Sequence, residues 1–451
     1  MEKRTDMRAE ALDTLIDIER NKKLSHIAIG ETLMRHQFEK KSDRAFYTRL
    51  CEGVTERKIH LDYILDTYSK TPMRKCKPLI RSLLRMGAYQ ILFMDVRDAA
   101  ACSEAVSLAK KRGFGRLSGF VNGVLRTIVR EKERLPVPDK KEFDKYLSIT
   151  YSVPEWLSRL MIDQYGAQTA EMMFASFLEA RPLTIRTNLS VITPEALEEE
   201  LKKEGVSVER GNYLPYALTI SHLNYLGKLA AFRQGKFVVQ DESSQLAVEV
   251  ADINEGDFVL DVCAAPGGKT FHAADRLHGT GKVLSRDLTE YKTDLIEENK
   301  DRMCYENVEV QQWDALVEDE SLLESVDVLL ADLPCSGLGI MGRKNDIKYQ
   351  MTQQQLSELA QLQRDILSVI WKYVKPGGEM IFSTCTLNRG ENIENIRWIE
   401  ENTPMRLVSI EDYLPETLKG RTGSQGYLQL IPGKDSCDGF FISKFERPEA
   451  R

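Results

Sequence analysis

Two cysteines follow apolar runs at equivalent places in this sequence, which indicates paired thiol chemistry. The run Leu329–Ala331 stops at Asp332 and Cys335, and the run Met380–Ser383 leads to Cys385. Apolar runs that end in an acid, a proline or a glycine are typical of interior strands of a parallel sheet. Ligands of open α/β sheets bind beyond the carboxyl ends of the strands, so both thiols are candidates for chemistry. The alternative is an ordinary core strand with an incidental cysteine, because free cysteine is among the most buried residue types.

Two thiols and an acid at one sheet edge would suit the methylation of carbon 5 of a cytosine. That carbon is a poor nucleophile, but addition of a thiolate to carbon 6 turns the ring into an enamine that can attack a methyl sulfonium. The adduct must then lose its carbon-5 proton and expel the thiolate, so a base or a second thiol is useful. Asp332 is placed to keep the ring nitrogen N3 protonated as charge develops. Lys269, or a helix end, could lower the thiol pKa from its usual value of about 8.5.

The stretch from Phe258 to Thr270 has the pattern of a strand, a tight turn and a helix. Small residues let the backbone approach a ligand closely, and the helix start offers free N–H groups to a carboxylate. Acids then end three further strands, where they can accept ribose hydroxyls or an adenine amine. The turn is neither GxGxxG nor a P-loop, so S-adenosylmethionine is favoured over NAD and ATP; an α/β domain without a cofactor is the alternative. The candidate cofactor-binding residues are Cys263, Ala264, Ala265, Pro266, Gly267, Gly268, Lys269, Asp287, Asp314 and Asp332.

The elements that would position these residues alternate between strands and helices after Gly256, which is typical of a doubly wound sheet. A long helix is predicted from Thr352 to Val374, stopping at the segment Lys375–Gly378, and residues 439–445 could form a closing strand. The predicted strands are Phe258–Val262, Lys282–Arg286, Val308–Gln311, Asp327–Ala331 and Glu379–Ser383.

The chain of 451 residues is too long for one core and is predicted to form three domains. Residues 1–135 show helical spacing of apolar side chains and form an all-α domain that ends at the proline-containing linker Leu135–Asp139. Residues 136–235 combine linker helices with a small α+β domain, and residues 236–451 form the Rossmann-like α/β domain.

Composition indicates a globular protein whose N-terminal part binds a polyanion. The chain is 42% hydrophobic and 29% charged, and its net charge of −7 hides an asymmetry. Residues 1–135 hold 28 Lys and Arg against 18 Asp and Glu, so this part is basic and the remainder acidic. A helical surface that happens to be basic is the alternative. Eight cysteines without CxxC or Cys/His clustering favour a reducing cytoplasm over a disulfide framework or a zinc site. The first residues are charged, and no long apolar window is present, so we expect neither a secretory signal nor a membrane span.

Taken together, these motifs resemble the RNA 5-methylcytosine methyltransferases. The resemblance rests on Asp261–Thr270, on Asp332–Gly337 and on Ser383–Thr386, with further matches in three short segments. It implies that Cys385 is the nucleophile that adds to carbon 6 and that Cys335 resolves the adduct. DNA cytosine-5 enzymes assign the nucleophile to a Pro-Cys thiol, so the opposite assignment stays open. The further matching segments are Gln240–Gln245, Gly390–Asn392 and Asp438–Phe441.

The helical front resembles the antitermination-factor RNA-binding fold, and the segment Ser152–Leu157 resembles the joint that follows it. Together these features cover nearly the whole chain and are specific to the bacterial small-subunit rRNA branch of the family, the RsmB/Sun type. The resemblance implies a 16S rRNA (cytosine-5)-methyltransferase that uses S-adenosylmethionine. We expect the protein to be cytoplasmic and monomeric. A tRNA cytosine-5 methyltransferase and a non-catalytic RNA-binding assembly protein are the alternatives.

Two departures from the family pattern stand out, Asn345 in place of a proline and Arg286 before Asp287. From charge and position, Arg186, Arg343 and Lys348 are candidate RNA contacts, with ordinary exposed charge as the equal alternative.

Overall fold

The computed structural model describes residues 5–223 and 225–449. The chain divides into two compact units. The first comprises the chain up to Leu178 together with the short segment Met341–Gln350. The second comprises Glu179–Ile340 and the chain from Met351 onward. The predicted fold class is confirmed: helices form the N-terminal part, a small α+β domain follows, and an α/β domain with a mixed sheet ends the chain.

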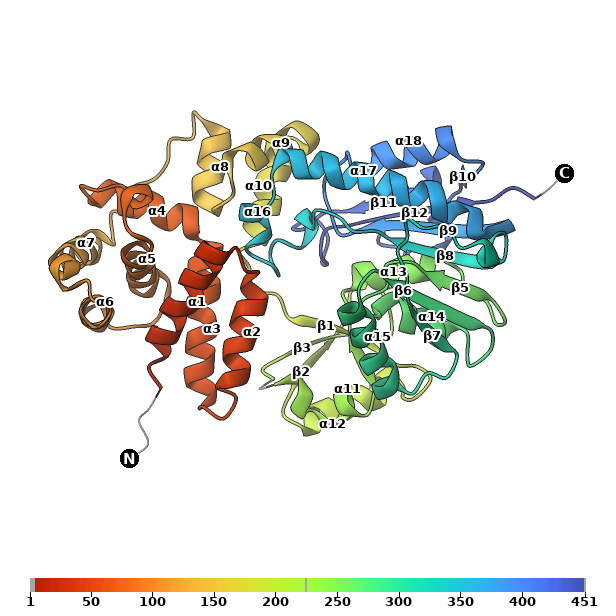
Figure 1. Ribbon diagram of the computed structural model, residues 1–451, viewed down its shortest axis with the longest axis horizontal. Helices are drawn as coiled ribbons and strands as arrows, with labels where there is room; N and C mark the ends of the chain where they lie inside the picture. Colours follow the sequence, from red (N-terminus) through yellow and green to blue (C-terminus); the bar gives the residue numbers. More distant parts are fainter. Residues whose placement is uncertain (1–4, 224, 450–451) are drawn as a thin grey trace. The chain divides into compact units, whose positions relative to one another are not determined.

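Within its described residues, from Thr5 onward, the first unit contains helices and no strands (Figure 1). Its helices start at recognisable sequence signals: the Asp6 side chain accepts from the N–H of Ala9 at the start of α1, and Pro78 occupies the first turn of α5. The helical spacing of apolar side chains predicted for residues 1–135 is seen, for example, in α7, where Val121, Leu125 and other apolar side chains are buried. The helices are α1 Met7–Asn21, α2 Ser25–Arg35, α3 Lys41–Glu56, α4 Lys58–Tyr68, α5 Pro78–Phe93, α6 Asp98–Lys111, α7 Ser118–Glu131, α8 Phe143–Tyr151, α9 Glu155–Tyr165, α10 Ala167–Ser176 and α16 Ile347–Gln350.

The segment Met341–Gln350 is anchored within this helical unit by buried polar side chains. The carboxylate of Asp346 accepts from both the N–H and the hydroxyl of Ser25, at 2.7 and 2.8 Å. The Lys348 ammonium donates to the carbonyl of Glu56 at 2.9 Å, and burial lowers the pKa of Lys348 to about 7. Lys348 is only 3% exposed, so the prediction of an RNA contact at this residue is wrong. Arg343 is exposed.

The small α+β domain of the second unit is a four-stranded antiparallel sheet with strand order β2-β3-β1-β4. Helix α11 begins at Thr193, whose hydroxyl accepts from the N–H of Ala196, and Pro194 follows in the first turn. Leu197 and Leu201 of this helix pack against Ile185 and Leu218 of the sheet. The elements are β1 Leu183–Thr187, α11 Pro194–Lys203, β2 Ser207–Arg210, β3 Ala217–Ser221, α12 Ala230–Arg233 and β4 Phe237–Val239.

The larger sheet has strand order β10-β12-β9-β8-β5-β6-β7, and β11 pairs with β12. The neighbours from β7 through β5 to β9 are parallel, whereas β12 is antiparallel to β9. The chain therefore runs outward from β5 to β7 and returns to β8 on the other side of β5. This arrangement makes the gap between the carboxyl ends of β5 and β8 a topological switch point, where ligands of such sheets bind. The strands are β5 Phe258–Asp261, β6 Lys282–Asp287, β7 Val308–Gln312, β8 Val326–Asp332, β9 Val374–Thr384, β10 Arg406–Leu407, β11 Tyr427–Leu430 and β12 Phe440–Glu446.

Helices cover both faces of this sheet because its interior strands are apolar on both sides (Figure 1). Val259 and Leu330 belong to one core cluster with residues of α13, α14 and α15, and their neighbours Leu260 and Leu329 belong to another with residues of α17 and α18. The helices are α13 Glu242–Val250, α14 Gly268–Arg276, α15 Glu290–Met303, α17 Gln353–Ile370 and α18 Ile393–Asn402. The predicted end of the long helix at Val374 is wrong: α17 ends at Ile370, and β9 already begins at Val374.

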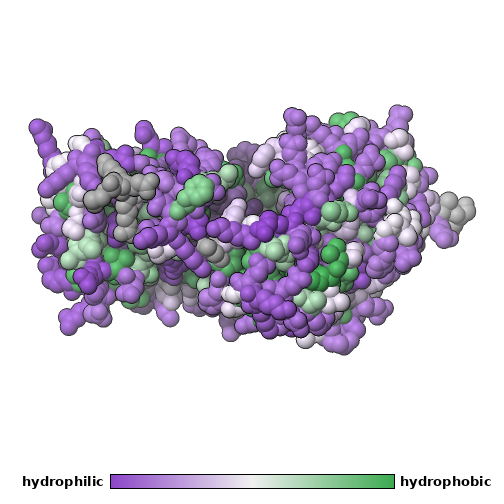
Figure 2. Space-filling model, turned by 90° about the horizontal axis from the view of Figure 1, so that it is seen from below, coloured by the Kyte–Doolittle hydropathy of each residue, from purple (hydrophilic) through white to green (hydrophobic). Residues whose placement is uncertain are grey.

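The surface carries mostly hydrophilic side chains, with separate apolar patches between them, on the face drawn in Figure 2. Among the residues that the structure describes, no helix has the length and apolar character needed to cross a membrane.

Candidate active site

The structure brings the two predicted thiols into contact. Strands β8 and β9 are parallel neighbours in which Asp332 is paired with Ser383, so the loops that follow them leave the sheet side by side. The sulfur atoms of Cys335 and Cys385 lie 3.2 Å apart, and both residues are half-buried. Residues 50 positions apart in the chain thus present two thiols at one point of the carboxyl edge.

Backbone contacts between loops hold this arrangement. The N–H of Gly339 donates to the carbonyl of Cys385, and the N–H of Gly439 donates to the carbonyl of Gly339, both at 3.0 Å. A Cβ atom on Gly339 would lie 2.0 Å from the carbonyl oxygen of Gly439. Only glycine allows this approach, and the loop carrying Cys335 is therefore attached directly to the backbone at Cys385.

The buried carboxylate of Glu391 connects the same two loops through hydrogen bonds. It accepts from the N–H and the hydroxyl of Ser336 at 2.8 and 2.6 Å, from Asn388 at 3.1 Å and from Gln363 at 3.2 Å. The Ser336 hydroxyl also contacts the hydroxyl of Thr386, which follows Cys385, at 2.6 Å. Burial raises the pKa of Glu391, and the hydrogen bonds from Ser336, Asn388 and Gln363 oppose that rise.

The electrostatic surroundings of Cys335 favour its protonated form. The pKa of Cys335 is raised well above its usual range by its hydrogen bond to Cys385, by burial and by the negative charges of Cys385, Glu391 and Asp332. The Cys335 sulfur therefore keeps its proton at neutral pH and can donate it toward the sulfur of Cys385.

Asp332 lies at the end of β8 and is held by two side chains. One oxygen accepts from the Lys269 ammonium at 2.6 Å, and the other accepts from the Ser383 hydroxyl at 2.9 Å. Lys269 also donates to the Ser244 hydroxyl at 3.0 Å. The structure thus places Lys269 against the acid.

The predicted cofactor turn follows β5 at the switch point. Gly267 has φ = +102°, and a Cβ atom there would lie 2.3 Å from the Phe271 ring, so the turn that opens α14 depends on glycine. A cavity of about 190 Å³ lies beside it. Seven of the residues predicted to bind the cofactor line this cavity. Five further lining residues were not predicted. Three of these five, Gln240, Asp241 and Ser244, belong to the segment Gln240–Gln245, which was identified only by its resemblance to the family. The lining residues are Val239, Gln240, Asp241, Ser244, Asp261, Cys263, Ala264, Ala265, Pro266, Gly268, Lys269 and Asp332.

The remaining predicted acids lie at the ends of β6 and β7. Asp287 is buried and accepts from the N–H of Ala265 in the turn at 3.0 Å, from Leu288 and from Lys292. Asp314 follows β7 and accepts from the N–H of Leu316 at 3.0 Å. Burial raises the pKa of Asp261, inside the cavity, to about 7. A helix start with free N–H groups, small turn residues and a carboxylate tied to the turn suit the carboxylate and the ribose hydroxyls of S-adenosylmethionine.

Arg286, the unusual residue before Asp287, is explained by its neighbours. It is buried, donates to Gln311 at 2.7 Å and to Asp319 at 2.5 Å, and stacks over the Trp313 ring at 4.5 Å. This arginine therefore ties β6 to β7 and to the loop beyond it, so the departure has a structural reason.

Comparison with known proteins finds a match in each part of the chain. Residues 248–446 match the family model described as 16S rRNA methyltransferase RsmB/F, residues 5–130 match the NusB family, and residues 153–224 match a ferredoxin-like domain of RsmF/B-like methyltransferases. A probable ribosomal RNA small subunit methyltransferase B of Bacillus subtilis (strain 168) is 35% identical over 450 residues, which is 99% of each chain. The chain belongs to the ribosomal RNA small subunit methyltransferase B family. It is also 30% identical to the methyltransferase B of Vibrio cholerae, over 89% of each chain.

Solved structures share the methyltransferase B fold. One described as "Crystal Structure of PH0851" has a TM-score of 0.81 and 26% identity and covers 98% of this chain and 100% of its own. The NSun6 protein from Pyrococcus horikoshii, solved with SFG, is similar in fold, with a TM-score of 0.57 and 23% identity over 69% of this chain and 98% of its own. The cofactor of the methyltransferase B family is S-adenosylmethionine.

Proposed function

We propose that this methyltransferase transfers a methyl group to carbon 5 of a cytidine in small-subunit ribosomal RNA through a covalent cysteine adduct. The observation that carries the proposal is the 3.2 Å contact between the sulfurs of Cys335 and Cys385. The two thiols lie in the loops that follow β8 and β9, and Asp332, at the end of β8, lines the cofactor cavity.

In the proposed reaction, Cys385 adds as a thiolate to carbon 6 of the cytosine, which places electron density on carbon 5. S-adenosylmethionine, when bound, supplies the electrophilic methyl group. In this proposal Asp332, fixed by Lys269 and Ser383, holds a proton at N3 of the ring as charge builds up during the addition. The adduct is resolved when the carbon-5 proton leaves, the carbon 5–carbon 6 double bond re-forms and the sulfur of Cys385 departs as a thiolate. Cys335, in contact with that sulfur, assists the departure by giving its proton to it, and the Cys335 thiolate formed in this way accepts the carbon-5 proton.

The electrostatics of the pair support Cys385 as the nucleophile and Cys335 as the residue that resolves the adduct. A nucleophile has to lose its proton, and the raised pKa of Cys335 disfavours that loss. The opposite assignment would require Cys335 to attack, although its raised pKa disfavours its thiolate form. The opposite assignment remains the alternative, and the mutants described below distinguish it from the proposed one.

The helical unit supports an RNA substrate. Residues 5–130 match the NusB family, and the first 135 residues carry an excess of positive charge. The relatives named above are ribosomal RNA small subunit methyltransferases, which favours small-subunit rRNA over tRNA. The target base must leave its stack to reach a thiol that is half-buried.

The experiment combines RNA carrying tritium at carbon 5 of cytidine with the wild type and two single mutants. We expect Cys385→Ala to abolish tritium release, and Cys335→Ser to slow product release so that a protein–RNA adduct resistant to denaturation accumulates. Cys304→Ala is the matched control, because Cys304 is exposed and lies outside the site. Full activity of both active-site mutants would refute the two-thiol mechanism, and an adduct formed by Cys385→Ala would reverse the assignment. Bisulfite sequencing of small-subunit rRNA and tRNA, with and without the gene, identifies the substrate.

A further inference from the structure

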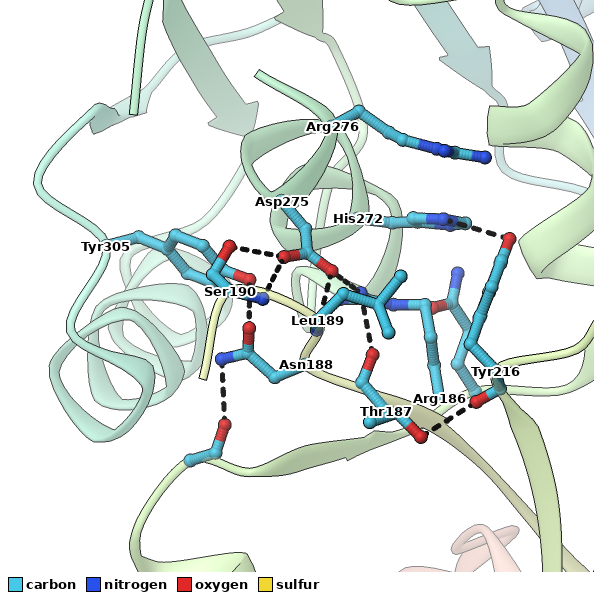
Figure 3. A network of polar contacts seen from close by, with 12 residues as sticks. Arg186, Thr187, Asn188, Leu189, Ser190, Tyr216, His272, Asp275, Arg276 and Tyr305 are labelled. Atoms are coloured by element: carbon cyan, nitrogen blue, oxygen red, sulfur yellow. Dashed lines mark hydrogen bonds and ion pairs between the residues drawn. The ribbon is translucent and has the colours of Figure 1, made fainter. Parts of the chain in front are cut away.

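A fully buried arginine, Arg186, lies where the small α+β domain packs against α14, the helix that follows the cofactor turn. It comes from β1, has 0% exposure and pairs with Asp275 of α14 at 2.8 Å. Figure 3 shows this pair within a network of polar side chains. The earlier expectation that Arg186 contacts RNA is therefore wrong, and its charge needs another explanation because burying a guanidinium is costly.

One half of the network is an anchor. Besides Arg186, the Asp275 carboxylate accepts from the N–H of Leu189 at 3.1 Å and from the N–H and hydroxyl of Ser190 at 2.9 and 2.5 Å (Figure 3). These bonds attach the loop after β1 to the end of α14. Both oxygens of the Asp275 carboxylate therefore accept hydrogen bonds, and neither needs the Nε of Arg186 as a donor.

The other half of the network leads from Arg186 to the active site. Arg186 Nε donates to Gln240 Oε1 at 3.1 Å, and Gln240 Nε2 donates to the Ser244 hydroxyl at 3.4 Å. The same hydroxyl accepts from Lys269, which donates to Asp332. A continuous chain of hydrogen bonds thus connects a strand of the small domain with the acid beside the two thiols.

Each link sets the orientation of the next. Because Arg186 can only donate, Gln240 must present its carbonyl to the arginine and its amide N–H to Ser244. Ser244 then accepts from both Gln240 and Lys269. Two of the three N–H groups of Lys269 are thereby used, by Ser244 and by Asp332, which leaves one donor and fixes its direction.

We propose that Arg186 is a positioning residue that fixes Lys269, and through it Asp332, by way of Gln240 and Ser244. The inference rests on the proposed function for the role of Asp332 toward the base. It assigns to the small domain a part in the chemistry, in addition to any contact with RNA. Gln240, Ser244 and Lys269 all line the cofactor cavity, so the same chain of bonds also shapes that cavity.

The test compares two substitutions on either side of Asp275. Arg186→Lys keeps a positive charge for Asp275, but a single ammonium cannot reach both Asp275 and Gln240 as the planar fork does. Ser190→Ala is the matched control, because it removes a bond to Asp275 and leaves the contact between Arg186 and Gln240 intact. We expect Arg186→Lys to lower kcat and the affinity for S-adenosylmethionine, measured by calorimetry, about tenfold each. We expect Ser190→Ala to lower the melting temperature and to leave both quantities unchanged.

Ser244→Ala provides a second test that does not touch the anchor, should Arg186→Lys fold poorly. It should reproduce the two losses, and the double mutant Arg186→Lys/Ser244→Ala should be no worse than Ser244→Ala, because both break one chain of bonds. Wild-type values of kcat and affinity in Ser244→Ala, or in a folded Arg186→Lys, would overturn the proposal. So would additive losses in the double mutant. A wild type that releases no tritium from the RNA would refute the proposed function instead, and the cofactor affinities would still decide on Arg186.

Discussion

Replacing Glu391 by Ala removes the acceptor of four hydrogen bonds beneath the two thiols. Glu391 is fully buried, so water cannot replace the lost acceptor. Gln363 keeps its hydrogen bond to the carbonyl of Pro334, and the Ser336 hydroxyl keeps its contact with Thr386. Both donors therefore retain a hydrogen-bond partner. The backbone N–H of Ser336 loses the carboxylate altogether.

The expected cost follows from these partners. Hydrogen bonds to a charged group contribute about 1.5–3 kcal/mol each, and a buried donor left without an acceptor costs about 1–3 kcal/mol. Part of this is offset because the carboxylate no longer has to be buried, as the raised pKa of Glu391 indicates. We expect Glu391→Ala to lower the free energy of unfolding of the catalytic part by about 3–5 kcal/mol. Glu391→Gln keeps one oxygen acceptor and the shape, and should cost about 1–2 kcal/mol.

The geometric consequence can be measured separately from stability. Loss of Glu391 frees the Ser336 loop from Asn388 and Gln363, so the sulfurs of Cys335 and Cys385 should spend less time in contact. The assay is the rate at which diamide joins the two thiols into a disulfide, followed by mass spectrometry, together with thermal unfolding. We expect Glu391→Ala to react at least tenfold more slowly than the wild type and to melt about 10 °C lower, with Glu391→Gln between the two. A Glu391→Ala protein with the wild-type melting temperature and diamide rate would refute the reasoning.

Three further predictions concern the loops, pH and the cofactor. Gly339→Ala should abolish tritium release, because its Cβ would lie 2.0 Å from the backbone oxygen of Gly439, whereas Gly115→Ala, with open space around it, should be active. Burial and the charge of Arg186 lower the pKa of His272 from 6.5 to about 4, so the unfolded chain binds a proton first as the pH falls. The free energy of unfolding should therefore fall from pH 6.5 to 4 by up to roughly 3 kcal/mol, and urea titrations of His272→Gln should lack this part of the slope. Asp287→Asn should weaken S-adenosylmethionine binding about tenfold or more in calorimetry, because the carboxylate is the acceptor predicted for the ribose; an unchanged affinity would exclude that role.

The sequence by itself determined the fold class and the edge of the sheet at which we propose that the chemistry occurs. Apolar runs such as Leu329–Ala331 are buried on both faces and stop at polar residues, and these local patterns need no knowledge of partners. Because parallel strands end at a common edge, the acid Asp332 and the two thiols could be assigned to one place before their distance was known.

Only the tertiary structure decided which charged side chains face solvent and which are buried. Arg186 and Lys348 look like surface charges in the sequence, yet each is buried against partners that are remote in the chain, Asp275 at 89 residues and Glu56 at 292 residues. Glu391 and Ser244 lie in segments that were singled out only by resemblance. Their hydrogen-bond partners could not be predicted, because a hydrogen-bond network is defined by several segments that meet only after folding. Sequence patterns record the burial of apolar faces over a few turns or strands, whereas the pairing of polar groups depends on long-range packing.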